Sequence, residues 1–326
     1  MLSKDSQALL LLCSHLGLDM DAGPKPLTLR EWNPLARKIQ SSAFNRPGTL
    51  LGQTVGEIQQ QLALSQVEAQ RLSLLLERRA AIDSELERLA SKGIGVTTRA
   101  ASDYPSRYRE RLKDSAPPIL FYAGELALLG QPGIAVVGSR HLDQAGQECA
   151  EFVGNTCGLS GLVLYSGGAK GVDTLSMNAA LEARGSAVGI LADNLEHAVR
   201  NSEIRAALAR RDLCLATPYA PDAGFSVGAA MGRNRLIYCL ADYAIVVASD
   251  AEKGGTWAGA TEALKAGWLP VFVLDHPAMP EGNRLLLQKG GVAFPHPFPE
   301  HYSQLPGWLL ENSLPPKQPA TQLGLF

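Results

Sequence analysis

Glycine-rich turns in this sequence carry the residue types that could bind phosphate. The most informative is Ser166-Gly167-Gly168-Ala169-Lys170-Gly171, which lies between a short apolar run and a helical pattern. Its glycines let backbone N–H groups point at an anion where the helix starts, and Lys170 adds a full positive charge. The spacing fits neither a P-loop nor a dinucleotide-binding turn. We therefore predict a phosphate-binding loop of a different type.

Two more turns and one basic motif complete the set of candidate binding residues. Gly138-Ser139-Arg140 follows another apolar run, and Gly254-Gly255-Thr256 precedes a helical pattern. Arg233-Asn234-Arg235 lies near the start of a third helical pattern. Residues two apart face different sides of a helix, so we expect one arginine in a pocket and the other bracing a neighbouring element. Asp173 is interpreted as a helix-dipole or loop-bracing carboxylate.

Short apolar runs alternate with helical patterns over the larger part of the chain. Strands are expected at 119–122, 134–138, 162–165, 187–191, 213–216, 243–248 and 270–274. Helices are expected near 143–158, 171–184, 201–211, 229–241 and 256–266. This alternation predicts an α/β fold with an extended, Rossmann-like, doubly wound and mostly parallel sheet. Ligands of such sheets bind outside the carboxyl ends of the strands, where we expect Arg140, Lys170 and one arginine of 233–235 to form a basic pocket.

Residues 1–92 are expected to form a small, all-helical domain. Three Ser/Thr-x-x-Glu capping boxes mark helix starts, at Thr28, Thr54 and Ser65. The last box is expected to open one long helix that Lys92-Gly93 ends. Residues 93–311 would then form the Rossmann-like domain, and 312–326 a flexible, proline-rich tail.

Composition limits the classes of function. The chain has 30 basic and 32 acidic residues and a net charge of −2, so any nucleic-acid site must gather its positive charge locally. Five cysteines without a Cys-x-x-Cys pair predict reduced thiols, with no metal site and no cofactor. The six histidines stand in no catalytic context, so no catalytic residue is predicted. Without an apolar run of about 20 residues, we expect a cytoplasmic protein and no membrane contact.

The order of these motifs resembles the DNA-processing protein A (DprA/Smf) family over roughly residues 90–295. Ser-Gly-Gly-Ala-Lys-Gly-Val-Asp at 166–173, combined with Arg-Asn-Arg at 233–235, carries the resemblance, and Ser102-Asp103-Tyr104-Pro105 and Gly282-Asn283-Arg284 extend it. The helical N-terminal region is similar to that family's sterile-alpha-motif-like domain. The resemblance implies a homodimer that binds and protects single-stranded DNA and hands it to a RecA-type recombinase.

The resemblance also implies which residues contact DNA, mainly through backbone phosphates. The implied DNA-binding set is Gly138, Ser139, Arg140, Ser166, Gly167, Gly168, Lys170, Gly171, Arg233, Asn234, Arg235, Gly254, Gly255 and Thr256. Asp173 and Asn283 are the implied structural loop residues. Binding through phosphates predicts salt sensitivity and little dependence on base sequence.

The chain departs from the family pattern at several positions. Ser176 and Met177 replace the usual Ala-His, Ala230-Met231 replaces Phe-Pro, and Gly254-Gly255-Thr256 replaces Ser-Gly-Ser. The chain after Pro295 is too short for the C-terminal winged helix of many members. We interpret it as a divergent branch, whose pathway could be transformation, genome maintenance or phage defence.

The final peptide, Gln322-Leu323-Gly324-Leu325-Phe326, resembles the Gln-Leu-x-Leu-Phe motif that docks on the replicative sliding clamp. Leu323, Leu325 and Phe326 could fill an apolar pocket, and Gln322 could hydrogen-bond at its rim. This predicts the sliding clamp as a partner. The alternative is a tail that folds back onto its own body.

An enzymatic alternative rests on a second resemblance. Rossmann proteins of the LOG type cleave nucleoside monophosphates with a Pro-Gly-Gly-x-Gly-Thr loop and a nearby glutamate. Lys253-Gly254-Gly255-Thr256 and Glu262 are superficially similar, although the proline is missing and Thr256 follows the glycine pair directly. A nucleotide-sensing module without catalysis is a third possibility.

Overall fold

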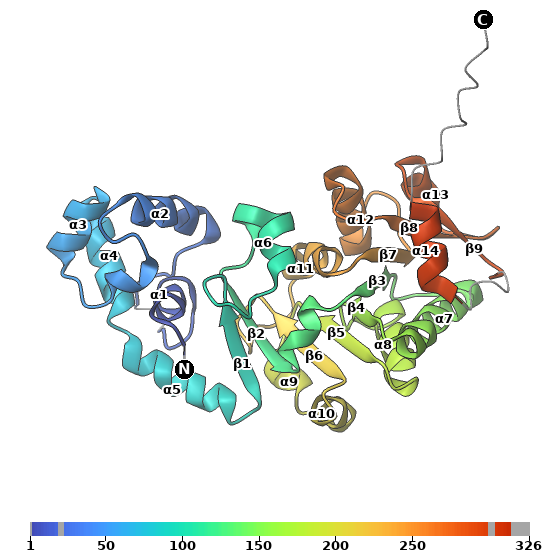
Figure 1. Cartoon of the computed structure of the whole chain (residues 1–326), viewed down its shortest axis with the longest axis horizontal. Coiled ribbons are helices and arrows are strands. Elements are labelled where there is room, and N and C mark those ends of the chain that lie inside the picture. The colour runs from blue at the N-terminus through green and yellow to red at the C-terminus, as the bar shows by residue number, and fades with distance from the viewer. Residues whose placement is uncertain (1, 19–22, 299–303, 314–326) are drawn as a thin grey trace, which may run out of the picture.

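One nine-stranded sheet runs through the computed structural model of the chain, which describes residues 2–18, 23–298 and 304–313 (Figure 1). Its spatial order is β1-β2-β6-β5-β4-β3-β7-β8-β9. The strands are β1 (Ile94–Thr98), β2 (Ile119–Gly124), β3 (Gly133–Gly138), β4 (Val163–Ser166), β5 (Ser186–Ile190), β6 (Leu213–Thr217), β7 (Tyr243–Ala248), β8 (Val271–Asp275) and β9 (Val292–Pro295). β2 is antiparallel to both neighbours, and the other pairs are parallel. The predicted α/β, mostly parallel sheet is confirmed.

Helices cover both faces of the sheet, as Figure 1 shows. One face carries α7 (Gln144–Ser160), α8 (Val172–Glu182), α9 (Leu195–Ala198), α10 (Ser202–Ala209) and α14 (Leu305–Ser313). The other carries α6 (Ser106–Leu112), α11 (Val227–Leu240), α12 (Gly254–Ala266) and α13 (Glu281–Gln288). Along β3, Ile134 and Val136 join the first core, whereas Ala135 and Val137 join the second. Burial on both faces explains why this strand is a continuous apolar run.

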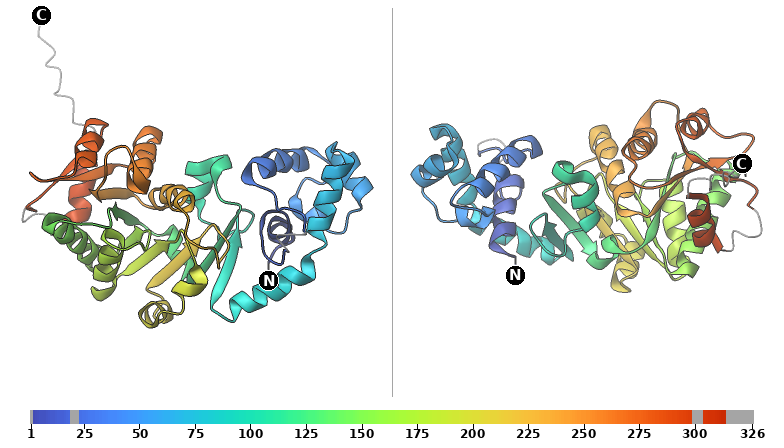
Figure 2. Two further views of the ribbon diagram at one scale, coloured as in Figure 1. Left: turned by 180° about the vertical axis from the view of Figure 1, so that it is seen from behind. Right: turned by 45° about the horizontal axis from the view of Figure 1, so that its top comes forward.

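The N-terminal helices form a group at one end of the molecule, beside β1, in both views of Figure 2. They are α1 (Lys4–Cys13), α2 (Leu29–Ser41), α3 (Val55–Leu62), α4 (Gln66–Leu76) and α5 (Arg79–Ala90). The three capping boxes are present, with Thr28, Thr54 and Ser65 each accepting from the third residue of its helix. The leucines of α1 belong to the same buried core as Ile119 and Phe121 of β2, so this group packs directly on the sheet.

The prediction of a single long helix from Ser65 to Lys92 is wrong. The chain breaks it at Glu77–Arg78 into α4 and α5. Arg78 turns its guanidinium inward and donates to the carbonyl oxygens of Leu16 (2.9 Å) and Leu75 (3.2 Å). Apolar periodicity carries no information about this contact with a residue 62 positions away.

Short and edge elements were not predicted either. Among the described residues, these are β1, β9, α6, α9, α13, α14 and the 3₁₀ helices η1 (Pro47–Leu50), η2 (Lys113–Ser115) and η3 (Leu126–Gly130). β1 and β9 are edge strands with only partly buried patterns, so neither gives a strong apolar run.

Two predictions from composition can be compared with the structure. All five cysteines are free, and four of them are buried. Within the described residues, no helix combines the length and the apolar character needed to cross a bilayer.

Candidate functional site

The three glycine-rich turns meet where the strand order reverses. From β3 the chain proceeds through β4, β5 and β6 on one side, and then through β7, β8 and β9 on the other. Ser139 N donates to Ala248 O (2.9 Å), and Val172 N donates to Ser139 O (3.3 Å). These bonds join the loops that follow β3, β4 and β7. Ligands of open parallel sheets bind at this kind of switch point.

Glycines allow the loops to approach so closely. Gly171 has a φ of +92°, and a Cβ there would lie 2.6 Å from Ser139 O. A Cβ on Gly167 would overlap the guanidinium of Arg233. Gly171 is therefore needed both for its positive φ and for the close approach of two backbones, and Gly167 leaves room for the Arg233 side chain.

Arg233 of α11 lies at the centre of this arrangement. It is only 5% exposed, and its Nη1 is 3.9 Å from Asp173 Oδ2. Among the described residues, its Nε and Nη1 have no hydrogen-bond partner. Burial lowers the pKa of Arg233, an effect that the Asp173 carboxylate opposes, and the guanidinium stays charged. Buried N–H groups of a cation without partners favour an anionic ligand.

Asp173 lies in the first turn of α8 and faces Arg233. Its Oδ2 accepts from Ala169 N (3.3 Å), which braces the loop. Burial raises the pKa of Asp173, whereas Arg233 and the Ala169 N–H act to lower it. The carboxylate therefore contacts the loop after β4 and lies beside Arg233.

Two pockets open on either side of Arg233. The first, here called the loop pocket, has a volume of about 360 Å³ and is lined by Gly167, Gly168, Lys170, Ala192, Asp193 and Phe225. The second, here called the α12 pocket, has a volume of about 310 Å³. Its lining includes Gly138, Ser139, Asp173, Asn234, Lys253, Gly254, Gly255 and Thr256. Arg140, Ala169 and Arg233 line both pockets, so the two are contiguous.

Comparison with known proteins decides the family. The family model described as DNA recombination-mediator protein A matches residues 95–297. The chain belongs to this family. The match includes the three turns and Arg233, and it leaves out α1–α5 and the tail.

Curated relatives from two organisms match parts of the chain. Protein Smf of Escherichia coli is 30% identical over 186 residues, which cover 56% of this chain and 49% of that protein. The DNA processing protein DprA of Streptococcus pneumoniae is 31% identical over 182 residues, covering 54% of this chain and 62% of that protein. The matches thus span about half and about three fifths of these relatives' lengths.

Solved structures share the fold. DprA of S. pneumoniae superimposes with a TM-score of 0.63 at 23% identity and covers 90% of this chain and 95% of its own. A DNA processing protein A from Helicobacter pylori, described for its single-stranded DNA binding mode, has a TM-score of 0.55 at 24% identity and covers 68% of this chain and 99% of its own. At these identities the likeness concerns the fold alone.

Two residues of the implied DNA-binding set, Ser166 and Arg235, do not face the pockets. Ser166 is fully buried and its Oγ donates to Val136 O (2.7 Å). Arg235 lies outside both pockets, where it pairs with Glu262 (3.0 Å). Asn283, an implied structural loop residue, is buried, and its amide donates to Val247 O (3.0 Å) and Leu274 O (2.9 Å).

The position of Glu262 bears on the enzymatic alternative. Thr256 lines the α12 pocket, but Glu262 does not line it and instead pairs with Arg235. A LOG-type mechanism needs the glutamate at the loop that binds the nucleotide. Among the described residues, the lining of the α12 pocket therefore gives the hydrolase no support.

Phe225 is a candidate ligand-binding residue that sequence reasoning missed. Its side chain is 54% exposed at the loop pocket, and the Arg140 guanidinium lies 5.5 Å from the ring centroid. An exposed aromatic ring beside cations is suited to stack on a base. The available signal was a phenylalanine next to Gly224 in the loop before α11.

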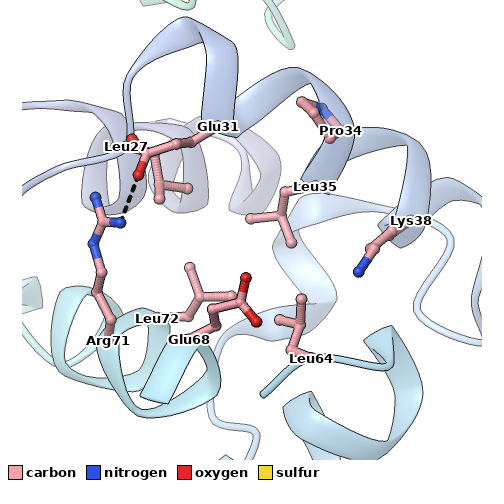
Figure 3. A pocket seen from close by; sticks show the side chains of 9 residues that line it. All are labelled: Leu27, Glu31, Pro34, Leu35, Lys38, Leu64, Glu68, Arg71 and Leu72. Atoms are coloured by element: carbon pink, nitrogen blue, oxygen red, sulfur yellow. Dashed lines mark hydrogen bonds and ion pairs between the residues drawn. The ribbon is translucent and has the colours of Figure 1, made fainter. Parts of the chain in front are cut away.

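A further pocket, of about 230 Å³, lies among the N-terminal helices (Figure 3). Leu27, Leu35, Leu64 and Leu72 contribute apolar surface, and Glu31 pairs with Arg71 at 2.7 Å. Glu68 is a second carboxylate in the lining. Because Arg71 is already paired and two carboxylates are present, this pocket is a poor site for phosphate.

Proposed function

We propose that this protein binds single-stranded DNA at the two pockets around Arg233 and acts as a recombination mediator. The observation that carries the proposal is the buried guanidinium of Arg233, whose Nε and Nη1 lack hydrogen-bond partners among the described residues. No side chain caps α12, whose first turn lies at the α12 pocket. Backbone N–H groups and a buried cation therefore converge on one place, as a phosphate requires.

The charge distribution supports binding of the DNA backbone. The chain as a whole is slightly acidic, yet Arg140, Lys170 and Arg233 gather in the loop pocket, opposed there by Asp193. Contacts with phosphates give affinity that falls with salt and depends little on sequence. Phe225 adds a surface on which a base can stack, and stacking of this kind also depends little on base sequence.

Membership in the recombination-mediator family supports the same function. The H. pylori relative is described for binding single-stranded DNA, and the family description names a role in recombination. The pockets provide a physical basis for such binding in this chain.

Anisotropy of a labelled thymidine oligonucleotide of about 16 nucleotides tests DNA binding. We expect binding at low salt, and a loss of about 10-fold for Lys170→Ala, because a charged contact to phosphate is removed. Arg235→Ala is the matched control, since Arg235 lies outside both pockets. Absence of binding at low salt, or equal losses for both variants, would contradict the proposal.

Delivery of the DNA to a RecA-type recombinase is the finer part of the proposal. The family description as a recombination mediator supports it. The test is RecA-catalysed strand exchange on DNA coated with single-stranded-DNA-binding protein. We expect this protein to speed up the reaction, and Lys170→Ala to do so less; no effect of the wild type would contradict recombinase loading.

A homodimer is a separate proposal, supported by the family resemblance. Sedimentation equilibrium of the full chain tests it over a range of concentrations. A mass of twice the 34.8 kDa of one chain is expected. A single-chain mass at the highest concentration would contradict it.

A tether to the replicative sliding clamp is the last part of the proposal. It rests on the sequence of Gln322, Leu323, Leu325 and Phe326, which lie outside the described residues. Clamp binding by the full chain is expected to disappear on deletion of 322–326, while DNA binding remains. If the intact chain shows no clamp binding, or if deletion does not change it, the tether is contradicted.

A further inference from the structure

The start of α12 is an uncapped helix N-terminus inside a pocket. Lys253 occupies the N-cap position and supplies no side-chain hydrogen bond, whereas Asp143, Asn201 and Ser226 cap α7, α10 and α11. Gly254 follows with a φ of +82°, and open space lies in front of its Cα. The first N–H groups of this 13-residue helix can therefore receive a ligand that enters the α12 pocket.

Arg233 gives an independent indication of an anion there. Its side chain lines the α12 pocket, is 95% buried, and leaves Nε and Nη1 without hydrogen-bond partners among the described residues. The nearest acid, Asp173, lies 3.9 Å from Nη1, beyond hydrogen-bond distance. The guanidinium and the helix start thus supply two sets of donors from two different elements.

The charges of the pocket favour a strongly negative group. Arg140, Arg233 and Lys253 are its arginine and lysine residues, and Asp173 and Asp250 are its acids. The two carboxylates offset part of this positive charge. The partial positive charge of the α12 N-terminus adds to the three cations.

The donors of the α12 pocket favour a terminal phosphate over an internal one. Buried Val137 and Ile237 close part of it, whereas Arg140, Ala169 and Arg233 connect it to the loop pocket. A terminal phosphate presents three free oxygens to the donors and carries about −1.5 to −2 at pH 7.

We infer that the α12 pocket binds a phosphomonoester, either at the end of a DNA strand or on a free nucleotide. The DNA arm of this inference rests on the proposed function, in which the neighbouring loop pocket holds the internal phosphates. The protein would then distinguish strand ends from strand interiors. A free nucleotide would compete with the strand end for the same donors.

Four forms of one thymidine oligonucleotide of about 16 nucleotides test the inference: 5′-phosphorylated, 3′-phosphorylated, unphosphorylated and circular. We expect one phosphorylated form to bind about 10-fold more tightly than the unphosphorylated and circular forms. Lys253→Ala is expected to reduce this preference, and Arg235→Ala, outside both pockets, to retain it.

Titration with thymidine monophosphate and thymidine covers the second source of the ligand. Binding of the monophosphate but not of thymidine supports the inference and identifies free nucleotides as ligands. Equal binding of all four oligonucleotides, together with no binding of the monophosphate, overturns the inference and leaves the proposed function intact. If no oligonucleotide binds, the proposed function fails, and the monophosphate titration alone decides the inference.

Discussion

Arg233 and Asp173 face each other behind the glycine-rich loop, with Nη1 and Oδ2 3.9 Å apart and both side chains buried. The arginine comes from α11 and the aspartate from α8, so the pair connects helices on opposite faces of the sheet. The distance is too long for a hydrogen bond. Arg233 therefore retains donors for a ligand while Asp173 partly balances its charge.

Removal of the Arg233 side chain should destabilise the fold, because Asp173 loses the cation beside it. Arg233→Ala leaves a buried carboxylate without its cation, and we expect a loss of about 3 kcal/mol in the free energy of unfolding. Adding Asp173→Asn should recover part of this loss, because the buried charge is then absent. Urea unfolding of the two single variants and the double variant measures the coupling. Additive effects would show that the two side chains do not interact.

Gly167→Ala should disturb the same centre without changing any charge. A Cβ at this position would overlap the Arg233 guanidinium, so we expect a lower unfolding midpoint and weaker binding of single-stranded DNA. Gly56→Ala in α3 is the matched control, since its Cβ would meet no atom within 4 Å. That control should be stabilised by up to about 1 kcal/mol and should bind DNA normally. Wild-type affinity of Gly167→Ala would rule out a role for this close approach.

Phe225→Ala should weaken DNA binding without altering its salt dependence. The exposed ring lies beside Arg140 and is proposed to stack on a base, an interaction worth about 1–3 kcal/mol. We expect an affinity loss of about 10-fold at every salt concentration, and near-normal affinity for Phe225→Trp. Anisotropy titrations of both variants measure this. If Trp is as damaging as Ala, stacking is not the role of Phe225.

Glu31 should make the N-terminal helices sensitive to acid. The Arg71 guanidinium (2.7 Å) and the Thr28 N–H (2.8 Å) lower the pKa of Glu31 from 4.5 to about 2. A depressed pKa stabilises the fold above the ordinary value, and this contribution is lost as the pH falls from 4.5 towards about 2. Glu31→Gln should therefore flatten the decline of stability with acid. The free energy of unfolding is measured against pH for the wild type and for Glu31→Gln. The same decline with acid in both proteins would contradict the role of Glu31.

The central strands and the location of the site could be predicted because their signals are local. β3 and β7 are buried on both faces and read as continuous apolar runs, and the glycine-rich turns follow β3 and β4 or precede α12 directly. The fold rule that parallel strands share a functional edge then brings these turns together.

The remaining features depend on contacts between distant residues. Helical periodicity indicates that Arg233 and Arg235 diverge, but only the packing of α8 and α12 decides which one faces the pockets. The break between α4 and α5 depends on Arg78 reaching Leu16. Phe225 becomes a candidate only when its loop is placed beside Arg140. None of these contacts leaves a periodic pattern in the sequence.

The salt dependence of single-stranded DNA binding tests the central claim most directly. For the wild type and for Arg140→Ala/Lys170→Ala, the dissociation constant is measured from about 50 to 200 mM salt, with Arg235→Ala as control. If these side chains contact phosphates, the plot of the logarithm of the dissociation constant against log salt should be less steep by about 1.4 in the double variant. Its slope should stay unchanged in the control. An unchanged slope and affinity in the double variant would contradict phosphate binding at these pockets.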